Sequence, residues 1–219
     1  IPARKGSKRI KNKNIKLFNG KPIISYSIQT AIRSKIFDRI ICSTDCNKIA
    51  KIAINYGATV PFKRSKKYSD DYTSTQSVIK YIINKLKLES NSSICCIYPT
   101  TPFLSYKDII KSYNILTKNK NRFVFAATKY RSNPYRSFKL NKKNYTKMVF
   151  SKYYNNRSQN LQNLYYDSGQ YYWGYLKTWM KNKKIFDNSI ILETDPLKSI
   201  DINTIEDWQF AEQIYKSLK

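Results

Sequence analysis

Apolar positions along the chain fall into two alternating patterns, short continuous runs and longer segments with helical spacing. Helical spacing predicts helices over residues 21–34, 46–57, 74–88, 105–119 and 203–218. Continuous apolar runs predict buried strands over residues 38–44, 58–62, 92–99, 122–128, 169–175 and 188–193. Because short buried strands separated by helices are typical of parallel sheets covered on both faces, we predict an α/β fold with a mostly parallel sheet.

The alternation breaks down between residues 130 and 166. Residues 129–150 predict two short strands around an Asn-Lys turn, and a polar, aromatic and irregular stretch follows. Insertions of this kind are commonly lids or binding loops, so we interpret residues 130–166 as an inserted dimerisation or lid element. No linker rich in Gly, Pro or Ser divides the chain. Residues 1–219 are therefore predicted to form one domain, whose first strand is truncated at the opening "IPA".

Composition narrows the class of protein. The 219 residues are 41% hydrophobic, which supports a folded core and argues against disorder. The formal net charge is +27, but Lys is spread over the whole chain together with Asn, Ile and Tyr. We interpret this charge as drift towards AT-rich codons, and we keep a nucleic-acid-binding protein as the alternative from another class.

The sequence shows no clear pattern for a cysteine-based metal site, a transmembrane helix or a signal peptide. The four Cys include no CxxC pair and the chain has no His, so small buried thiols in a reducing cytoplasm are expected rather than a zinc site. No run of about 18 uncharged apolar residues is present. The first residues lack the apolar region of a signal peptide. We therefore expect a cytoplasmic protein without a membrane partner.

The stretch "IPARKGSKRIKNKNI" follows the first predicted strand, at the sheet edge where ligands bind in such folds. Gly6 permits a tight turn, Ser7 adds a hydroxyl donor, and Arg4, Lys8 and Lys13 supply cations. A Gly-containing loop with exposed N–H groups and cations favours anion binding. Neither GxxxxGK[ST] nor GxGxxG is present. From spacing alone, a triphosphate site and a solvated basic loop therefore remain open.

Several motifs resemble one enzyme family. "IPARKGSKRIKNKNI" closely resembles the "IPARxGSKxxxxKNI" signature of the cytidylyltransferases that activate nine-carbon sugar acids. "GKPIISYSI", "FDRIICSTD", "IAKIAINYGATVPFKRSKKYSDDYTST", "YPTTPF", "YYDSGQYYWG" and "SIDINTIEDW" follow in the family's order and, with the first stretch, cover nearly the whole chain. "VPFKR", the Tyr of "YPTTPF" and "DSGQYYWG" are similar to members that use pseudaminic acid. The resemblance implies a Rossmann-like nucleotidyltransferase fold with a protruding dimerisation element, acting as a homodimer.

The resemblance also implies an activity. Such enzymes transfer CMP from CTP to the anomeric hydroxyl of a nine-carbon sugar acid, release pyrophosphate and use Mg²⁺. Pseudaminic acid is the implied acid, and neuraminic and legionaminic acid are the alternatives. Nucleic acid is not among the implied partners. A degenerate relative that binds CTP without turnover is a further alternative.

Site residues are implied by the same motifs. Nucleotide binding is implied for Arg4, Gly6, Ser7, Lys8, Lys13, Asn14, Arg64, Tyr98, Pro99 and Thr100. Contact with the sugar acid is implied for Arg157, Asp167, Gly169 and Gln170. Catalytic roles are implied for Arg4, Lys13 and Asp201, and magnesium binding for Asp201 and Asn203.

Some of these roles have structural alternatives. The family pattern is Asp-Ile-Asp, so Asn203 brings an uncharged amide, and its alternative is the N-cap of the last helix. Asp207 is expected in the first turn of that helix. Asp45 is a weaker metal candidate whose alternative is a helix cap, and Arg64 has a surface position as its alternative.

The aromatic residues after the inserted segment also have two interpretations. They are Tyr165, Tyr166, Tyr171, Tyr172 and Trp173. By alternation along a strand, about half are expected to pack internally and half to face the substrate. At Tyr98, which stands where the neuraminic acid enzymes usually have Gln, backbone contacts to the base are expected rather than side-chain contacts. Pro99 is interpreted partly as a turn-forming residue.

Overall fold

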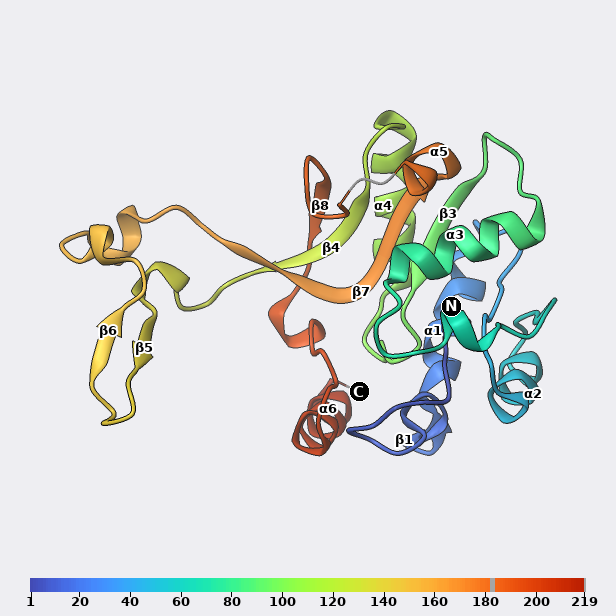
Figure 1. The fold of residues 1–219 in the computed structure, drawn as a ribbon, viewed down its shortest axis with the longest axis horizontal. Helices are drawn as coiled ribbons and strands as arrows, with labels where there is room; N and C mark the ends of the chain where they lie inside the picture. The colour runs from blue at the N-terminus through green and yellow to red at the C-terminus, as the bar shows by residue number, and fades with distance from the viewer. Residues whose placement is uncertain (182–183, 219) are drawn as a thin grey trace.

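The computed structural model describes residues 1–181 and 184–218. Figure 1 shows a body in which helices surround a sheet, and an arm that extends far from it. Among the described residues, no helix has the length and apolar character needed to cross a membrane.

The central sheet has four strands in the order β3 (Ser93–Ile97), β7 (Tyr165–Tyr175), β4 (Val124–Lys129) and β8 (Ile190–Glu193). β8 runs parallel to β4, but β7 runs antiparallel to both of its neighbours. The sheet is therefore mixed, whereas the sequence predicted a mostly parallel one. The physical reason is the arm: the chain leaves the body at the end of β4 and returns directly along β7, so these two strands form one long hairpin.

The two other predicted strands form less regular structure than expected. Residues 38–44 and 58–62 contribute only single parallel bridges, Pro2 to Ser43, Ile41 to Thr59 and Thr44 to Lys63. Pro61 cannot donate a ladder hydrogen bond, which limits pairing in the second of these segments. The bridges nevertheless bring the start of the chain beside residues 38–44, which in turn lie beside residues 59–63. A short hairpin that the sequence did not predict follows, with β1 (Leu17–Phe18) and β2 (Lys21–Pro22).

The helices agree closely with the predicted ones. They are α1 (Ile23–Ser34), α2 (Asn47–Asn55), α3 (Thr75–Leu86), α4 (Tyr106–Lys118), α5 (Leu176–Met180) and α6 (Ile205–Ser217). Short 3₁₀ turns lie at Lys13–Ile15, Lys66–Tyr68, Pro134–Arg136, Ser151–Tyr153, Ser158–Asn160 and Pro196–Lys198. Side-chain caps fix several starts: Ser74 accepts from the Ser77 N–H, and Ser105 accepts from the Lys107 N–H.

Two hydrophobic cores lie on opposite faces of the sheet. Tyr171 and Trp173 of β7 pack with residues of α4, and Tyr172, between them, packs with residues of α3 and α5. All three are buried because both faces of the sheet are covered, so alternation does not divide them into internal and substrate-facing sets. Tyr165 is 40% exposed at the start of the same strand, where the arm leaves the body.

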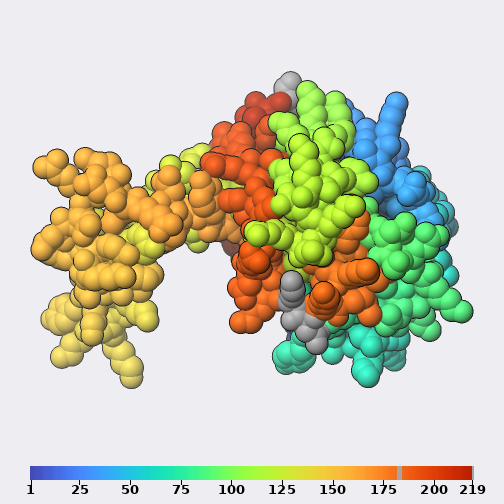
Figure 2. Space-filling view, turned by 90° about the horizontal axis from the view of Figure 1, so that it is seen from above, coloured from blue at the N-terminus to red at the C-terminus, as the bar shows by residue number. Residues whose placement is uncertain are grey.

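The inserted segment forms the arm seen in Figures 1 and 2. β5 (Phe138–Leu140) and β6 (Thr146–Met148) pair antiparallel within it, which confirms the predicted hairpin. Large apolar side chains are exposed along this arm: Phe138 is 63% exposed, and Tyr154 is 71% exposed. Apolar surface gathered on a projecting element is typical of a protein–protein contact.

Candidate active site

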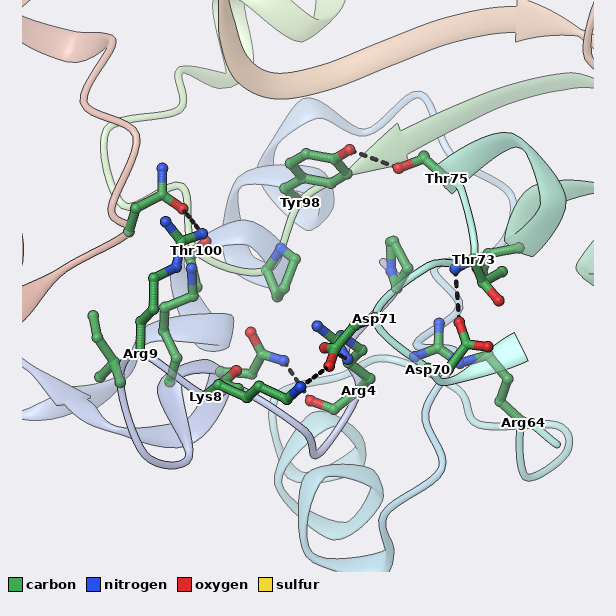
Figure 3. Close-up of a pocket in the computed structure, with 18 of the residues that line it drawn as sticks. Arg4, Lys8, Arg9, Arg64, Asp70, Asp71, Thr73, Thr75, Tyr98 and Thr100 are labelled. Atoms are coloured by element: carbon green, nitrogen blue, oxygen red, sulfur yellow. Dashed lines mark hydrogen bonds and ion pairs between the residues drawn. The ribbon is translucent and has the colours of Figure 1, made fainter. Parts of the chain in front are cut away.

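A cavity of about 640 Å³ lies on the body of the protein, between segments from both ends of the chain. Figure 3 shows side chains that line it. The sequence-predicted residues among its walls are Arg4, Ser7, Lys8, Lys13, Asn14, Arg64, Tyr98, Pro99, Thr100, Asp201 and Asn203. The predicted nucleotide residues and the predicted metal residues therefore meet in one place, although almost 200 positions separate some of them along the chain.

The basic loop begins with a tight turn. The Ser7 N–H donates to the Lys5 carbonyl at 2.9 Å, so the backbone reverses at Gly6. A Cβ at Gly6 would lie 3.4 Å from Nη1 of Arg4. This is an ordinary van der Waals distance, so the Arg4 guanidinium lies close to the turn without requiring the absence of a side chain at Gly6.

Two polar side chains hold this loop against the body. Asn14 is buried, and its Nδ2 donates to the Arg4 carbonyl at 2.9 Å, so the loop folds back on itself. Asp45 Oδ1 accepts from the Lys5 N–H at 2.9 Å. The N-cap position of α2 belongs to Cys46, so the predicted helix-cap role of Asp45 is wrong. In this arrangement both side chains anchor the loop through its backbone, since Asp45 accepts from the Lys5 N–H and Asn14 donates to the Arg4 carbonyl.

Cations line the cavity at different depths. Lys13 Nζ donates to the Ile202 carbonyl at 2.7 Å, which ties the loop to the C-terminal segment. Burial lowers the pKa of Lys13, while the nearby Asp201 carboxylate acts in the opposite direction. Arg64 is only 4% exposed, so the alternative of a surface position is wrong. Burial lowers the pKa of Arg64, and its Nε donates to Ser69 Oγ at 3.1 Å.

An acidic loop that the sequence analysis did not single out faces these cations. Asp71 Oδ1 lies 2.5 Å from Arg4 Nη1, and Asp71 Oδ2 lies 2.5 Å from Lys8 Nζ. Asp70 shapes the loop, because its Oδ1 accepts from the N–H groups of Tyr72 at 3.0 Å and Thr73 at 2.7 Å. Figure 3 shows Asp71 between Arg4 and Lys8.

The wall after β3 is rigid. The Tyr98 hydroxyl is hydrogen-bonded to Thr75 Oγ1 at 2.7 Å, and its carbonyl accepts from Ser27 Oγ at 2.8 Å and Thr101 Oγ1 at 3.0 Å. Burial raises the pKa of Tyr98 to about 12. Because both ends of Tyr98 are held by the protein, the backbone of the following turn is fixed at the cavity wall. Pro99 and Thr100 line the cavity from this turn.

The C-terminal wall carries Asp201 and Asn203. Asn203 Nδ2 donates to Asp201 Oδ2, and Asn203 Oδ1 accepts from Arg9 Nη2 at 2.8 Å. Thr204 is the N-cap of α6 and Asp207 completes a capping box with it, so the predicted N-cap role of Asn203 is wrong and the expected place of Asp207 is confirmed. The contact between Arg9 and Asn203 joins residues 194 positions apart.

The carboxylate set fits a magnesium ion only in part. Asp201 is exposed at the cavity, and one carboxylate with phosphate oxygens and waters is a usual magnesium environment. Asn203 turns its amide nitrogen towards Asp201 and its oxygen towards Arg9, so no amide oxygen is free beside that carboxylate. Among the described residues, no group of three or more His, Cys, Asp or Glu could hold a metal ion.

The predicted sugar-acid residues lie next to this wall or on the arm. Gly169 has φ 63°, and a Cβ there would lie 3.9 Å from Asp201 Cγ. Asp167 accepts from the Gly169 N–H at 3.0 Å and from the Tyr172 hydroxyl, and burial raises its pKa. The Gln170 side chain is buried and donates to the Lys198 carbonyl at 2.6 Å, and the Gln170 carbonyl accepts from the N–H of Tyr98, a cavity residue, at 2.9 Å. Arg157 is exposed on the arm.

The fold and the cavity define an α/β protein with a cation-rich site of a size suited to a nucleotide. The chain belongs to the cytidylyltransferase family, since the model described as "Cytidylyltransferase" matches residues 1–213.

Individual relatives and structures agree with that family. The chain is 42% identical to a pseudaminic acid cytidylyltransferase of Campylobacter jejuni, over 99% of this chain and 94% of the relative. It is 42% identical to a CMP-N,N'-diacetyllegionaminic acid synthase of Legionella pneumophila over 47% of this chain and 45% of the relative. A structure of CMP:2-keto-3-deoxy-manno-octonic acid synthetase complexed with CTP is similar with a TM-score of 0.73. It is 13% identical, over 100% of this chain and 97% of that chain, and so shows a shared fold.

Proposed function

We propose that the protein transfers CMP from CTP to the anomeric hydroxyl of a nine-carbon sugar acid, pseudaminic acid, and releases pyrophosphate. The observation that carries this proposal is the cavity that Arg4, Lys8, Lys13 and Arg64 line together with Asp201. The choice of acid rests on the relative from Campylobacter jejuni, which matches along nearly the whole chain.

This reaction depends on cations that stabilise the transition state and on the positioning of the two substrates more than on a nucleophilic side chain. The anomeric oxygen forms a bond to the α-phosphorus and its hydroxyl proton passes to solvent, while the bond from that phosphorus to the oxygen bridging to the β-phosphate breaks. Negative charge gathers on the departing pyrophosphate, so cations fixed beside it stabilise the transition state. Arg4 and Lys8 supply that charge at one wall of the cavity, and Lys13 supplies it next to Asp201.

The base of CTP is placed at the wall after β3. Thr75, Tyr98 and Thr100 line this side of the cavity, and the Tyr98 hydroxyl is already bonded to Thr75. The backbone of the turn is therefore the better candidate for reading the edge of cytosine. Arg64, a buried side chain that also lines the cavity, is proposed to donate to the nucleotide from its guanidinium.

Mg²⁺ is the proposed metal, held by Asp201 together with the triphosphate. When bound, it supplies charge neutralisation and fixes the phosphate geometry. Because Asp201 is the one carboxylate that the described residues place on the C-terminal wall of the cavity, and its Oδ2 already accepts from Asn203, the ion is expected to bind tightly only with the nucleotide.

The sugar acid enters from the side of Gly169 and the arm. Asp167 and Gly169 lie beside Asp201, where the attacking hydroxyl must approach. Arg157 is the proposed partner of the sugar carboxylate, but it is exposed on the arm of the same chain and does not line the cavity. We therefore propose a homodimer in which the arm reaches the partner. Substituting Phe138, which is 63% exposed, by Asp should yield a monomer by analytical ultracentrifugation.

The state of the cysteines is relevant to the cellular compartment of the protein. All four are free thiols, which supports a reducing environment and the proposed cytoplasmic location.

The deciding experiment is pyrophosphate release across a panel of nine-carbon acids. With CTP and Mg²⁺ alone no pyrophosphate should appear, and release should begin when pseudaminic acid is added. Faster release with legionaminic or neuraminic acid would change the substrate but keep the reaction. CTP binding without release on any acid would identify a degenerate relative instead.

A further inference from the structure

The strongest unassigned feature of the site is the position of Asp71. Its two carboxylate oxygens are divided between two cations, Oδ1 on Arg4 and Oδ2 on Lys8, each at 2.5 Å. These are the cations of the basic loop, and Asp71 reaches them from the opposite wall of the cavity. A phosphate group with two adjacent oxygens would use the same two partners. The carboxylate and the outer phosphates of a nucleotide therefore cannot hold Arg4 and Lys8 in this way at the same time.

The loop that carries Asp71 is anchored at both ends and open at its tip. Ser69 Oγ accepts from the buried Arg64 and donates to the Ser65 carbonyl at 3.0 Å. At the other end, Thr73 Oγ1 donates to the Lys67 carbonyl at 3.2 Å. Between them Tyr72 is 94% exposed, so nothing in the described structure packs over the tip. The tip can therefore withdraw without disturbing its anchors.

The ion pairs of Asp71 with Arg4 and Lys8 are weak enough for a ligand to displace the carboxylate. Lys8 has a side chain that is 81% exposed, and those of Arg4 and Asp71 are about one-third exposed. Ion pairs in such positions are weak because water screens them. A triphosphate carries several negative charges and therefore displaces the single carboxylate of Asp71 from the two cations. A ligand with less negative charge at this position gains less binding free energy when it displaces Asp71.

We propose that Asp71 is a selectivity residue, an internal counter-anion that competes with the β- and γ-phosphates for Arg4 and Lys8. In the free protein it neutralises the two cations. During turnover it makes way for the triphosphate, and after the transfer it returns to the cations and helps pyrophosphate to leave. This inference rests on the proposed function, because it takes the loop cations to be the triphosphate site.

The test compares the binding of pyrophosphate, CTP and CMP to three full-length proteins by calorimetry. Asp71→Asn removes the competing charge, and pyrophosphate and CTP should bind about three- to tenfold more tightly to it than to the wild type. CMP lacks the outer phosphates, so its affinity should not change. Asp70→Asn is the matched control, since it removes the same charge one residue away and keeps an oxygen for the Tyr72 and Thr73 N–H groups. It should tighten pyrophosphate binding less than Asp71→Asn.

Kinetics give a second measurement that a structural defect would not reproduce. In Asp71→Asn the KM for CTP should fall, and pyrophosphate should inhibit at lower concentration. Unchanged or weaker pyrophosphate binding by Asp71→Asn would overturn the inference, as would an equal gain in Asp70→Asn. A wild type that binds neither CTP nor pyrophosphate would overturn the proposed function itself, whereas CTP binding without a gain in Asp71→Asn rejects the role of Asp71 alone.

Discussion

Arg64 offers a test in which stability and function should change in opposite directions. Its side chain is 4% exposed, and the protein provides it with one hydrogen bond to Ser69 and the more distant charge of Asp45. A buried charge without a close carboxylate destabilises the free protein, and replacing such groups by apolar side chains is often neutral or stabilising by about 1–4 kcal/mol. Arg64→Met loses the Ser69 bond, which offsets about 1 kcal/mol of that gain.

The net expectation for Arg64→Met is a free energy of unfolding higher by about 1 kcal/mol, taken from these two opposing effects. For a chain of 219 residues this raises Tm by about 2–4 °C. CTP binding should weaken by about 10- to 150-fold, because a charge-assisted hydrogen bond to the nucleotide is lost.

Thermal unfolding with and without CTP measures both effects in one experiment. Arg39→Met is the matched control, since it removes the same charge from an exposed position outside this cavity, and both quantities should stay near their wild-type values. A lower Tm for Arg64→Met together with unchanged CTP binding would refute the reasoning, because Arg64 would then be a structural residue.

Three further predictions follow from particular contacts. Asp201→Ala should abolish pyrophosphate release. Asn203→Asp should keep or raise pyrophosphate release and should tighten magnesium binding in the presence of CTP. A loss of activity in Asn203→Asp would contradict a metal site at the C-terminal wall. Gly174→Ala should lower the free energy of unfolding by about 1–3 kcal/mol in urea, because the new Cβ would lie 2.9 Å from ring atoms of Phe123, and unchanged stability would show that the core relaxes freely. Burial raises the pKa of Tyr98 from its ordinary value of 10.0 to about 12, so the folded state holds that proton more tightly and stability should fall as the pH rises through this window. Tyr98→Phe should reduce that fall in denaturation measurements, and an unaltered pH profile would count against the buried hydroxyl.

Hydrophobic periodicity was sufficient to locate the helices. The helical segments and the strands at β3 and β4 have the expected pattern because each buries one stripe or both faces against a neighbour. The direction of β7 could not be predicted in the same way, since apolar alternation is the same in a parallel and an antiparallel strand. It is decided by the connection, and the arm turns what would have been a crossover into a hairpin.

In the candidate site, too, residues of a local sequence motif could be predicted, whereas contacts that depend on tertiary structure could not. Arg4 and Lys13 belong to a local motif, so the sequence places them on one loop, and the topology brings Asp201 to the same cavity. Asp71 lies in a stretch that resembles the family, but no role was assigned to it, because an acidic pair in a Lys-rich turn has the same pattern as a solvated loop. The bond between Arg9 and Asn203 depends on tertiary approach alone, which no spacing rule anticipates.

Charge balance connects the two main inferences. A site that must hold a triphosphate concentrates cations whose mutual repulsion destabilises the protein when the ligand is absent. The structure offsets this repulsion unevenly: Arg4 and Lys8 share the displaceable carboxylate of Asp71, whereas Arg64 is buried and forms no ion pair with a carboxylate in the described part of the chain. The outer phosphates must therefore displace Asp71 before they can bind Arg4 and Lys8. The part of the nucleotide near Arg64 displaces no carboxylate and instead gives this cation a partner. It follows that Asp71→Asn and Arg64→Met should act on different parts of CTP, with CMP binding sensitive only to the second change.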